Sequence, residues 1–590
     1  MDQLPPLCEV HDDSPIEEVR LTVPTTDDKD LPVLTLRTWV LGIKSDRVRP
    51  NLATTRPPCA RKIDGHDPPR KILENPVDRM EGFAKSRALQ YQRARARHDS
   101  SFVGFLDPLC SEVVPQMKAF YHREINPWVA LLLIQTSQVM GYGFAGVFMK
   151  FLVDSPYMWW PSTLVDVSTY RAFHEVEECI QCKKISYFQR GDIRRDRWEI
   201  QHFRVLDSKR FELDKSAYEE YSPLYMSAFL VVSYGFCFAA ITATLVHVAL
   251  YNGRSIWRQY KQASSSSSRS DDIHTRLMKN NYKSIPQSWF IVLLLLMLGL
   301  SILTVEGFGK QFQLPFVGVL LACAMVFILL LPFGVLEATT SMGIDLALIS
   351  EMTSGYLYPG KPLATFAFKS YATSCMGLAL NFLKSFKFGH YMKIPPRSMF
   401  IVQIVGTVIA SSVDFATAWW LFSTVDGICD LDKLPVGSPW TCPGQTAINS
   451  SINIWAVIGP ARIFGSLSVY SSLYYYFLYG ASATVLVWII SRVFPKKEWI
   501  RKVNVPLIFA ASTQMPFAKP VHYWSWFIVA FFFNYVVYRR WRAWWSRYNY
   551  LLSSALTCGV ALMALLGSIF QFNGINGIGW WGQAVSDHCP

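Results

Sequence analysis

The chain has 590 residues, of which 51% are hydrophobic and 15% aromatic, while only 17% are charged. A soluble domain typically carries about 25% charged residues, so this composition excludes an ordinary soluble multi-domain protein. The net charge of +13 is compatible with nucleic-acid binding, but many of the basic residues lie between apolar segments, where they act as signals of membrane topology. We therefore expect an all-α, polytopic integral membrane protein that contacts the lipid bilayer and binds no nucleic acid.

The amino-terminal part of the chain is its most polar region. No apolar segment follows Met1, so we expect no cleavable signal peptide, and residues 1–43 are predicted to form a cytoplasmic tail and the start of a first helix. Between residues 44 and 116, no segment contains the roughly 20 apolar residues that a membrane-spanning helix needs. The composition of residues 44–116 is typical of a disordered insert, and a gene-model error is the alternative interpretation.

Apolar and basic segments alternate in the middle of the chain. Residues 117–178 are predicted to form a first transmembrane block, with a spanning segment from 127 to 153. A polar, arginine-rich insert follows at 179–210, and a further spanning helix is expected within 211–251. The next segment, 252–286, has an excess of Lys and Arg and contains a run of serines, which predicts a flexible cytoplasmic loop.

Residues 287–572 are predicted to form a carboxy-terminal transmembrane block, followed by a tail at 573–590. The long apolar segments of this block run over 288–306, 313–336, 399–422, 467–491 and 551–571. Two shorter segments, 341–358 and 363–383, are separated by a proline and a glycine. Short segments interrupted in this way are the best sequence indicator of a transporter's binding site.

The basic residues also predict which side of the membrane each loop occupies. The segments 492–502 and 539–547 are both basic, so both are expected in the cytoplasm. An even number of crossings must then lie between them, and the apolar stretch 505–519 is either one of two crossings or a re-entrant segment.

The polar loop at 424–449 is expected outside the cell, because Lys433 is its only basic residue. Cys429 and Cys442 lie in this loop, and an oxidising environment favours a disulfide between them. Asn449 begins an Asn-Ser-Ser sequence, which is a glycosylation signal close to the next membrane segment.

A rigid basic segment precedes the apolar run at 399–422. Proline has no backbone N–H and a fixed φ, so no helix is expected to continue through the adjacent Pro395 and Pro396. Lys393 and Arg397 flank the two prolines, where a membrane helix begins. The whole motif, Lys393-Ile394-Pro395-Pro396-Arg397, resembles the signature of the oligopeptide transporter family, in its peptide-carrying, fungal-type clade.

This resemblance implies a transporter-like helical bundle with short or broken helices. It implies proton-coupled transport of small oligopeptides (tetrapeptides, pentapeptides or glutathione-like peptides) by alternating access across the plasma membrane. Short peptides and protons are the transported partners, and no cofactor is implied. A metal-chelate transporter of the sister clade is an alternative.

The resemblance covers residues 117–178 and 211–585, with a trace at 15–43. The two polar inserts replace segments that would be membrane helices in the family. We therefore expect a bundle that lacks some helices of its amino-terminal half. A truncated, non-transporting member of the family is the second alternative.

Ionisable groups within membrane segments are costly and are therefore candidates for function. Glu351 lies in an apolar context and has a counterpart in the family, and Asp345 lies six residues before it; both are candidates for proton or substrate binding. The spacing places the two carboxylates on different sides of a helix and argues against a direct pair. A charge at a helix end that faces water is the alternative interpretation of Glu351.

Two further pairs of residues carry the resemblance. His174 and Glu175 resemble a family motif that would act in gating or coupling, and an interfacial cluster is the competing interpretation. Lys393 and Arg397 would suit a peptide carboxylate, although the cytoplasmic start of a helix explains them equally well. The sequence contains no clustered nucleophile and no His-Glu-x-x-His motif, so we expect no enzyme, no catalytic residue, no metal and no cofactor.

Overall fold

The computed structural model describes most of the chain from residue 112 onward and one short helix before it. The described residues are 14–23, 112–121, 123–175, 226, 228–263, 273–425, 427–429, 449, 451–465, 470–513 and 520–572. Regular structure in these ranges is helical throughout, which confirms the all-α prediction. Of the insert predicted at 44–116, residues 44–111 lie outside the described residues, and so do the insert predicted at 179–210 and the tail at 573–590.

Within the described residues, six helical segments are long and apolar enough to cross a membrane. They are Pro127–Leu152, Leu230–Arg258, Gln287–Glu306, Phe316–Thr340, Pro396–Thr424 and Ser471–Val493. Each of them overlaps a spanning segment that the sequence predicts. A hydrocarbon core about 30 Å thick requires about 20 helical residues, so hydropathy alone locates these helices well.

Local chemistry explains where the first of these helices starts. The side chain of Asn126 accepts a hydrogen bond from the backbone N–H of Trp128, and Pro127 occupies the first position of α6 (Pro127–Leu152). The glycines of α6 allow neighbouring helices to approach closely: a Cβ on Gly141 would lie 2.6 Å from the carbonyl oxygen of Cys375, and one on Gly146 would overlap the ring of Phe290. Small residues thus allow close packing of neighbouring helices against α6.

The helix at the centre of the molecule extends over residues 362–391. It consists of α15 (Pro362–Lys369), the π-helical turn η4 (Ser370–Ser374) and α16 (Cys375–Tyr391), and nearly all of its residues are buried. The prediction that this segment ends at 383 was wrong. Lys384, Lys387 and His390 lower the hydropathy of its last turns, and tertiary contacts rather than apolar composition hold those turns inside the protein.

A broken segment lies before this central helix, as the sequence predicts. The long helix α13 (Phe316–Thr340) ends at Ser341, which has a left-handed φ of 57°, and α14 (Ala347–Leu357) begins only after an irregular stretch. With 11 residues, α14 is about 16 Å long, which is about half the thickness of the hydrocarbon core. Helix α14 therefore cannot span the membrane.

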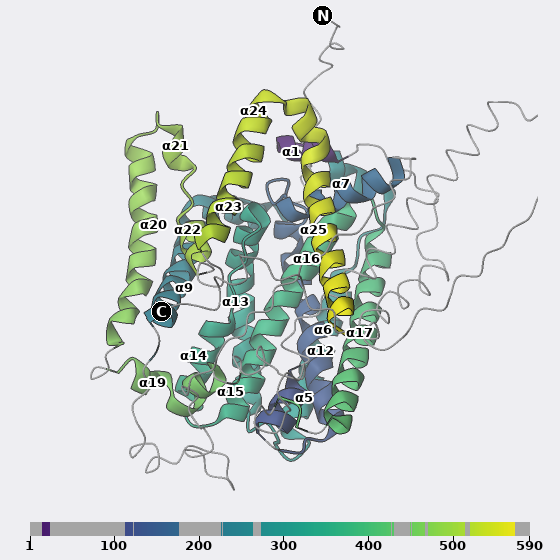
Figure 1. Ribbon diagram of the computed structural model, residues 1–590, viewed down its shortest axis with the longest axis vertical. Coiled ribbons are helices and arrows are strands. Elements are labelled where there is room, and N and C mark those ends of the chain that lie inside the picture. Colours follow the sequence, from purple (N-terminus) through teal and green to yellow (C-terminus); the bar gives the residue numbers. More distant parts are fainter. Residues whose placement is uncertain are drawn as a thin grey trace, which may run out of the picture.

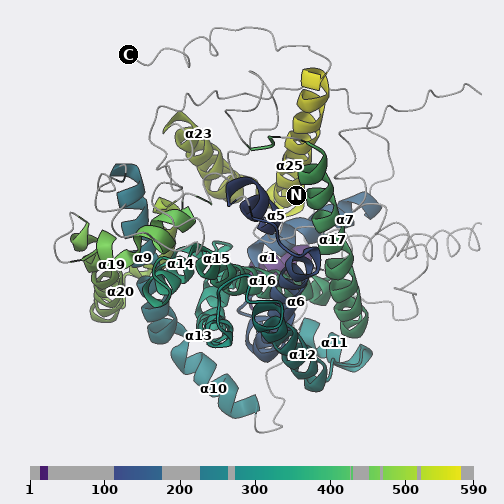
Figure 2. The ribbon, with the colours of Figure 1, turned by 90° about the horizontal axis from the view of Figure 1, so that it is seen from below.

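The remaining helices pack around the centre in two groups, as the end-on view in Figure 2 shows. On one side, α9 (Ala228–His247) packs along α20 (Tyr475–Val493), close to α14 and the short helix α19 (Pro460–Ile463). On the other side lie α6, α12 (Gln287–Glu306) and α17 (Pro396–Thr424), next to α16. Helix α12 packs along α6 over most of its length.

The buried apolar residues follow the same division. The main hydrophobic cluster is centred on α6, α13 and the helix at 362–391. A second cluster lies between α9, α14 and the segment 452–464; it contains Phe238, Leu348, Trp455, Ile458, Ile463, Phe464 and Leu473.

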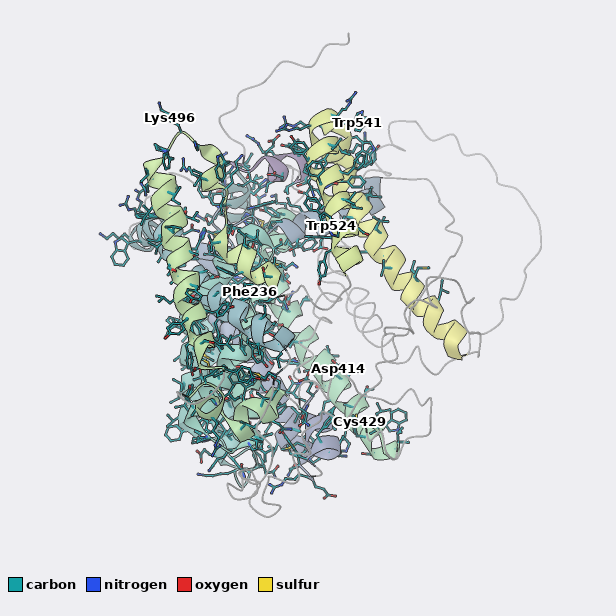
Figure 3. The ribbon with its side chains drawn as sticks, turned by 60° about the vertical axis from the view of Figure 1, so that its left-hand side comes forward. Phe236, Asp414, Cys429, Lys496, Trp524 and Trp541 are labelled. Atoms are coloured by element: carbon teal, nitrogen blue, oxygen red, sulfur yellow. The ribbon has the colours of Figure 1, made fainter. Side chains whose placement is uncertain are left out.

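The basic segments predicted to be cytoplasmic lie at one end of the molecule. Figure 1 shows α21 (Glu498–Arg501), α24 (Tyr538–Arg540) and α7 (Pro161–Glu175) at the upper end, and α5 (Val113–Pro115) at the lower end. In Figure 3, Lys496 and Trp541 lie at the same end, opposite Cys429. The segments 492–502 and 539–547 thus lie at the same end of the molecule, and the side of the membrane on which this end lies stays a prediction.

The segment after α21 returns to the end from which it starts. Helix α22 (Val505–Ser512) has eight residues, about 12 Å, and α23 (Pro520–Phe531), η8 (Phe532–Val537) and α24 lead back to the upper end in Figure 1. Of the two interpretations of 505–519, the described part favours the re-entrant one. The last described helix is α25 (Arg542–Phe572).

Candidate functional site

Glu351 and Lys369 form a buried ion pair. The Lys369 Nζ lies 2.6 Å from the Glu351 Oε1, and the two side chains are 6% and 3% exposed respectively. Glu351 is in the middle of the short helix α14, and Lys369 is the last residue of α15. The pair therefore joins the broken segment to the central helix.

The second oxygen of Glu351 also has a partner. Ser451 Oγ donates a hydrogen bond of 2.8 Å to the Glu351 Oε2. Ser451 comes from the segment that continues as η5 (Asn453–Ile458), which packs against α14 on the side of the second hydrophobic cluster. Burying a carboxylate is tolerable only when its oxygens are bonded and its charge is compensated, and both conditions are met here.

The central helix changes its geometry directly beside Lys369. The π-helical turn η4 begins at Ser370, and Thr373 in this turn lies 3.5 Å from Ser350 of α14, oxygen to oxygen. Single π-helical turns inside α-helices occur frequently at functional sites, because they widen the helix and redirect side chains. The turn here begins at the residue after Lys369, at the level of the ion pair.

Asp345, the second candidate carboxylate, is exposed. Its Oδ1 accepts a hydrogen bond of 2.9 Å from the backbone N–H of Ala347, at the start of α14. It lies within electrostatic range of Lys369 and of Cys237, which is in the middle of α9. No hydrogen bond joins Asp345 to Glu351 in the described contacts, which agrees with the spacing argument.

A third carboxylate near Lys369 was missed by the sequence analysis. Glu112 is 2% exposed and lies within electrostatic range of Lys369. It directly precedes α5 and the π-helical turn η1 (Gln116–Phe120). Residues 112–116, which the sequence assigned to the end of the polar insert, are therefore buried and largely helical; their apolar run is too short for a hydropathy signal.

Lys369 itself was also missed, although a signal for it existed. The segment 363–383 was interpreted as apolar, and its single lysine at position 369 was passed over. A lysine inside a membrane segment is a functional candidate by the same argument that selected Glu351.

The helix break predicted at Pro395 and Pro396 is present, and we call residues 392–395 the elbow. Helix α16 ends at Tyr391, α17 begins at Pro396, and the N–H of Ile394 bonds to the carbonyl of Gly389. Lys393 has a left-handed φ of 56°, the position that glycine usually takes in this type of helix end. Lys393 therefore holds a backbone conformation that residues other than glycine rarely adopt.

The contacts of Lys393 hold the helix α11 (Ile273–Asn281) against the elbow. Lys393 is 1% exposed, and its Nζ lies 2.8 Å from the Nδ1 of His274 in α11 (Ile273–Asn281). Arg397 Nε donates a hydrogen bond to the carbonyl of Ser284, at the end of the same loop. In this conformation Lys393 and Arg397 fasten the loop; Ile394 is buried beside them.

One turn before the elbow, Lys387 is buried as well. Its Nζ donates hydrogen bonds of 2.7 and 3.1 Å to the carbonyls of Val153 and Ser155, at the end of α6. The ring of His390 contacts the hydroxyl of Thr275 in α11, at 3.4 Å. Together with Lys393 and His274, these residues form a basic cluster at the carboxy-terminal end of the central helix.

The other predicted residues lie away from the ion pair or outside the described residues. His174 and Glu175 are in the last turn of α7, and their side chains are not described. Cys429 is disulfide-bonded, whereas Cys442 lies outside the described residues, so their pairing stays a prediction. Asn449 is 3% exposed, a position that does not favour glycosylation.

Comparison with known proteins connects this chain to a family. A family profile described as "OPT oligopeptide transporter protein" matches residues 108–189 and 185–571. The chain is 39% identical to oligopeptide transporter 5 and 38% identical to oligopeptide transporter 1 of Arabidopsis thaliana, and each alignment covers 99% of this chain and 94% of the relative. Oligopeptide transporter 7 of the same plant is 34% identical, over 98% of this chain and 90% of the relative.

The lengths of these alignments also show that this chain lacks positions that its relatives have. The alignments with transporters 5 and 1 each extend over 711 positions, although the chain has 590 residues. More than one hundred positions of each relative therefore have no counterpart here.

Proposed function

Because this chain belongs to the oligopeptide transporter family, we propose that it carries small oligopeptides across the plasma membrane together with protons. Membership of the family supports peptide transport by a multi-pass membrane protein, and it favours a transporter over an enzyme. The observation that supports the coupling is the buried Glu351–Lys369 ion pair, which lies between a half-length helix and the π-helical turn of the central helix.

The proposed coupling follows from the chemistry of this pair. A proton on Glu351 removes the negative charge that holds the Lys369 ammonium, and the ammonium then becomes available to a peptide carboxylate. Loss of the proton restores the pair and expels the carboxylate. Proton and peptide carboxylate therefore bind together, which is the requirement for coupled transport by alternating access.

The ion pair also connects the parts of the molecule that contain the two hydrophobic clusters. Helix α14 and the Ser451 segment pack in the second hydrophobic cluster, whereas Lys369 belongs to the helix at the centre of the main cluster. Making or breaking the pair changes how strongly these two parts of the molecule are held together. We propose that this contact is released and re-formed during each transport cycle.

Uptake by the purified full chain in proteoliposomes tests the proposal. We expect uptake of labelled tetra-alanine to rise with an inward proton gradient, and Glu351→Gln to remove the response to the gradient. Glu306→Gln is the matched control, because Glu306 pairs with Lys310 at 2.8 Å at an exposed helix end. Uptake by Glu351→Gln that follows the gradient as in the wild type would contradict the assignment of Glu351.

A truncated, non-transporting protein remains the second candidate, and the length of the alignments favours it. More than one hundred positions of the relatives are missing from a chain that nevertheless spans almost their whole length. If the wild-type chain folds in liposomes and takes up no peptide with any gradient, this second candidate is the correct one. A metal-chelate substrate is tested in the same vesicles with labelled iron–nicotianamine.

A further inference from the structure

The hairpin formed by α23, η8, α24 and α25 concentrates its positive charge at its turn. All of its arginines lie within nine residues of one another and have exposed side chains; they are Arg539, Arg540, Arg542 and Arg547. From residue 499 to residue 586 the sequence contains no Asp or Glu, so the hairpin itself supplies no carboxylate to balance them. We call these four residues the arginine patch.

The two legs of the hairpin expose apolar side chains instead. Before the turn, Trp526 and Phe527 of α23 are exposed, and after it Leu556 and Val560 of α25 are exposed. The turn itself lies at an end of the molecule, where Figure 1 shows α24 and Figure 3 shows Trp541. A change from exposed apolar residues to exposed arginines at the end of a bundle marks the level at which hydrocarbon gives way to lipid headgroups.

Aromatic rings position the arginines at this level. The Arg539 Nη1 donates a hydrogen bond of 3.0 Å to the Tyr535 hydroxyl, and the Arg539 Cζ lies 4.4 Å from the centre of that ring. The Arg540 Cζ lies 6.0 Å from the ring centre of the exposed Trp541. A ring over the face of a guanidinium group leaves the N–H groups at its edge available to a phosphate.

A carboxylate from the amino-terminal helix already contacts one arginine of the patch. Glu17 of α1 (Glu17–Thr22) forms an ion pair with Arg542. Helix α1 packs against α7 and α25, and Val19 and Val23, which are 1% and 4% exposed, fix it in the main hydrophobic cluster. Among the described residues, Glu17 is the one carboxylate that forms an ion pair with the patch.

We propose that the arginine patch binds the headgroup of an anionic phospholipid, and that Glu17 competes with this lipid for Arg542. Guanidinium groups bind phosphate through paired N–H donors. Anionic lipids are concentrated in the cytoplasmic leaflet, which is the side predicted for segment 539–547. The acyl chains of the lipid lie along the exposed apolar residues of the two legs, a contact that a free phosphate ion cannot make.

Retention of labelled lipid by the purified full chain tests this proposal without any transported peptide. Radiolabelled phosphatidylserine is bound to the chain in detergent micelles, and phosphatidylserine, phosphatidylcholine or inorganic phosphate is added as the competitor. We expect phosphatidylserine to compete at least about tenfold more strongly than phosphatidylcholine, because its net charge is negative. Equal competition by the two lipids, or displacement by phosphate at the concentration of the lipid, overturns the proposal.

Two triple variants show whether the charge of the patch is what the lipid recognises. Changing Arg539, Arg540 and Arg547 together to Gln should reduce the preference for phosphatidylserine to less than about threefold, since each basic residue at a membrane surface contributes about fivefold. Changing the same three residues to Lys keeps the charge and should preserve most of the preference. A loss in the Lys variant as large as in the Gln variant contradicts recognition by charge.

A matched control separates the patch from the total charge of this end. Lys496, Lys497 and Arg501 are also exposed and lie at the same end of the molecule, so changing these three to Gln removes as many charges. This variant should keep the preference for phosphatidylserine. Equal losses in the two Gln variants mean that binding follows the total charge and not the arginine patch.

Replacement of Glu17 tests the competition. Glu17→Gln removes the carboxylate that pairs with Arg542, and we expect it to strengthen the binding of phosphatidylserine by about two- to fivefold. Unchanged or weaker binding overturns the role of Glu17 as a competitor. The comparison of lipids in the wild type needs no variant and no uptake, so its result stands whether or not the chain transports peptides.

Discussion

The central helix at 362–391 buries lysines in two different ways. In its amino-terminal part, Lys369 is paired with the carboxylate of Glu351 at 2.6 Å. Near and directly after its carboxy-terminal end, hydrogen bonds to backbone carbonyls position Lys387, and the imidazole of His274 positions Lys393. Lysine is thus buried twice on this helix and once just after it, once with an opposite charge and twice with neutral acceptors among its partners.

The difference between these regions lies in what a proton can change. At the ion pair, one proton on Glu351 would remove the negative charge that pairs with the buried Lys369 ammonium. At the basic cluster, carbonyl oxygens do not titrate, so the hydrogen bonds of Lys387 persist over the physiological pH range. The first region is suited to switching, and the second to fastening the cytoplasmic loop to the bundle.

The largest loss of stability is expected when one partner of the Glu351–Lys369 ion pair is replaced and the other is kept. Glu351→Leu removes the carboxylate that pairs with the buried Lys369 ammonium, and we expect a loss of about 3–5 kcal/mol of stability. Adding Lys369→Met to Glu351→Leu should restore most of it, since two apolar side chains can replace a buried pair. Thermal unfolding of the purified variants measures both, and equal stability of the single and double variants would contradict the assignment.

A smaller loss of stability is expected when Lys387 is replaced. Lys387→Met removes the ammonium and its hydrogen bonds to Val153 and Ser155 together, so it leaves no buried charge behind. We expect a loss of about 1.5–3 kcal/mol, the range for hydrogen bonds to charged groups. The same unfolding assay applies; a loss as large as that of Glu351→Leu would show that the two regions do not differ as described.

The smallest loss of stability is a local one, caused by protonation of His274 at low pH. Burial, and then the nearby Lys393 and Lys387, lower the pKa of His274 from its usual value of 6.5 to about 3. The folded chain therefore favours neutral His274, and this contribution to stability is complete above pH 6.5 and is lost as the pH falls from 6.5 toward 3. At pH 5 the loss is at most about 2 kcal/mol.

Hydrogen exchange of the amides of α11 measures this loss directly. We expect faster exchange of α11 at pH 5 than at pH 7.5, after correction for the intrinsic rate. His274→Gln keeps an acceptor for Lys393 but does not titrate in this range, so its exchange should change little between the two values. Equal acid sensitivity of the wild type and His274→Gln would rule out protonation of His274 as the cause.

Part of the candidate site was predicted from the sequence and part was not. Glu351 was identified because a carboxylate in an apolar segment is conspicuous, and the helix break at Pro395 and Pro396 follows from backbone chemistry alone. Glu112 was assigned to a polar insert, because hydropathy over a window of about 20 residues does not detect a short buried helix.

The role of the elbow also needed the tertiary structure. The sequence explained Lys393 and Arg397 by their position at the start of a membrane helix. In the structure, both bind the cytoplasmic loop, and Lys393 does so from a left-handed backbone conformation. A pattern of charges predicts the side of the membrane, but it does not predict which loop those charges contact.

The sequence by itself determined the class of the protein, the positions of its long helices and the presence of a broken segment before the central helix. These properties depend on the length of apolar runs and on the backbone chemistry of proline and glycine, which are local. Only the tertiary structure decided that Lys369, 18 residues from Glu351, and Ser451, 100 residues from it, share its carboxylate. Such partners are set by how separate helices pack, and no local pattern specifies that packing.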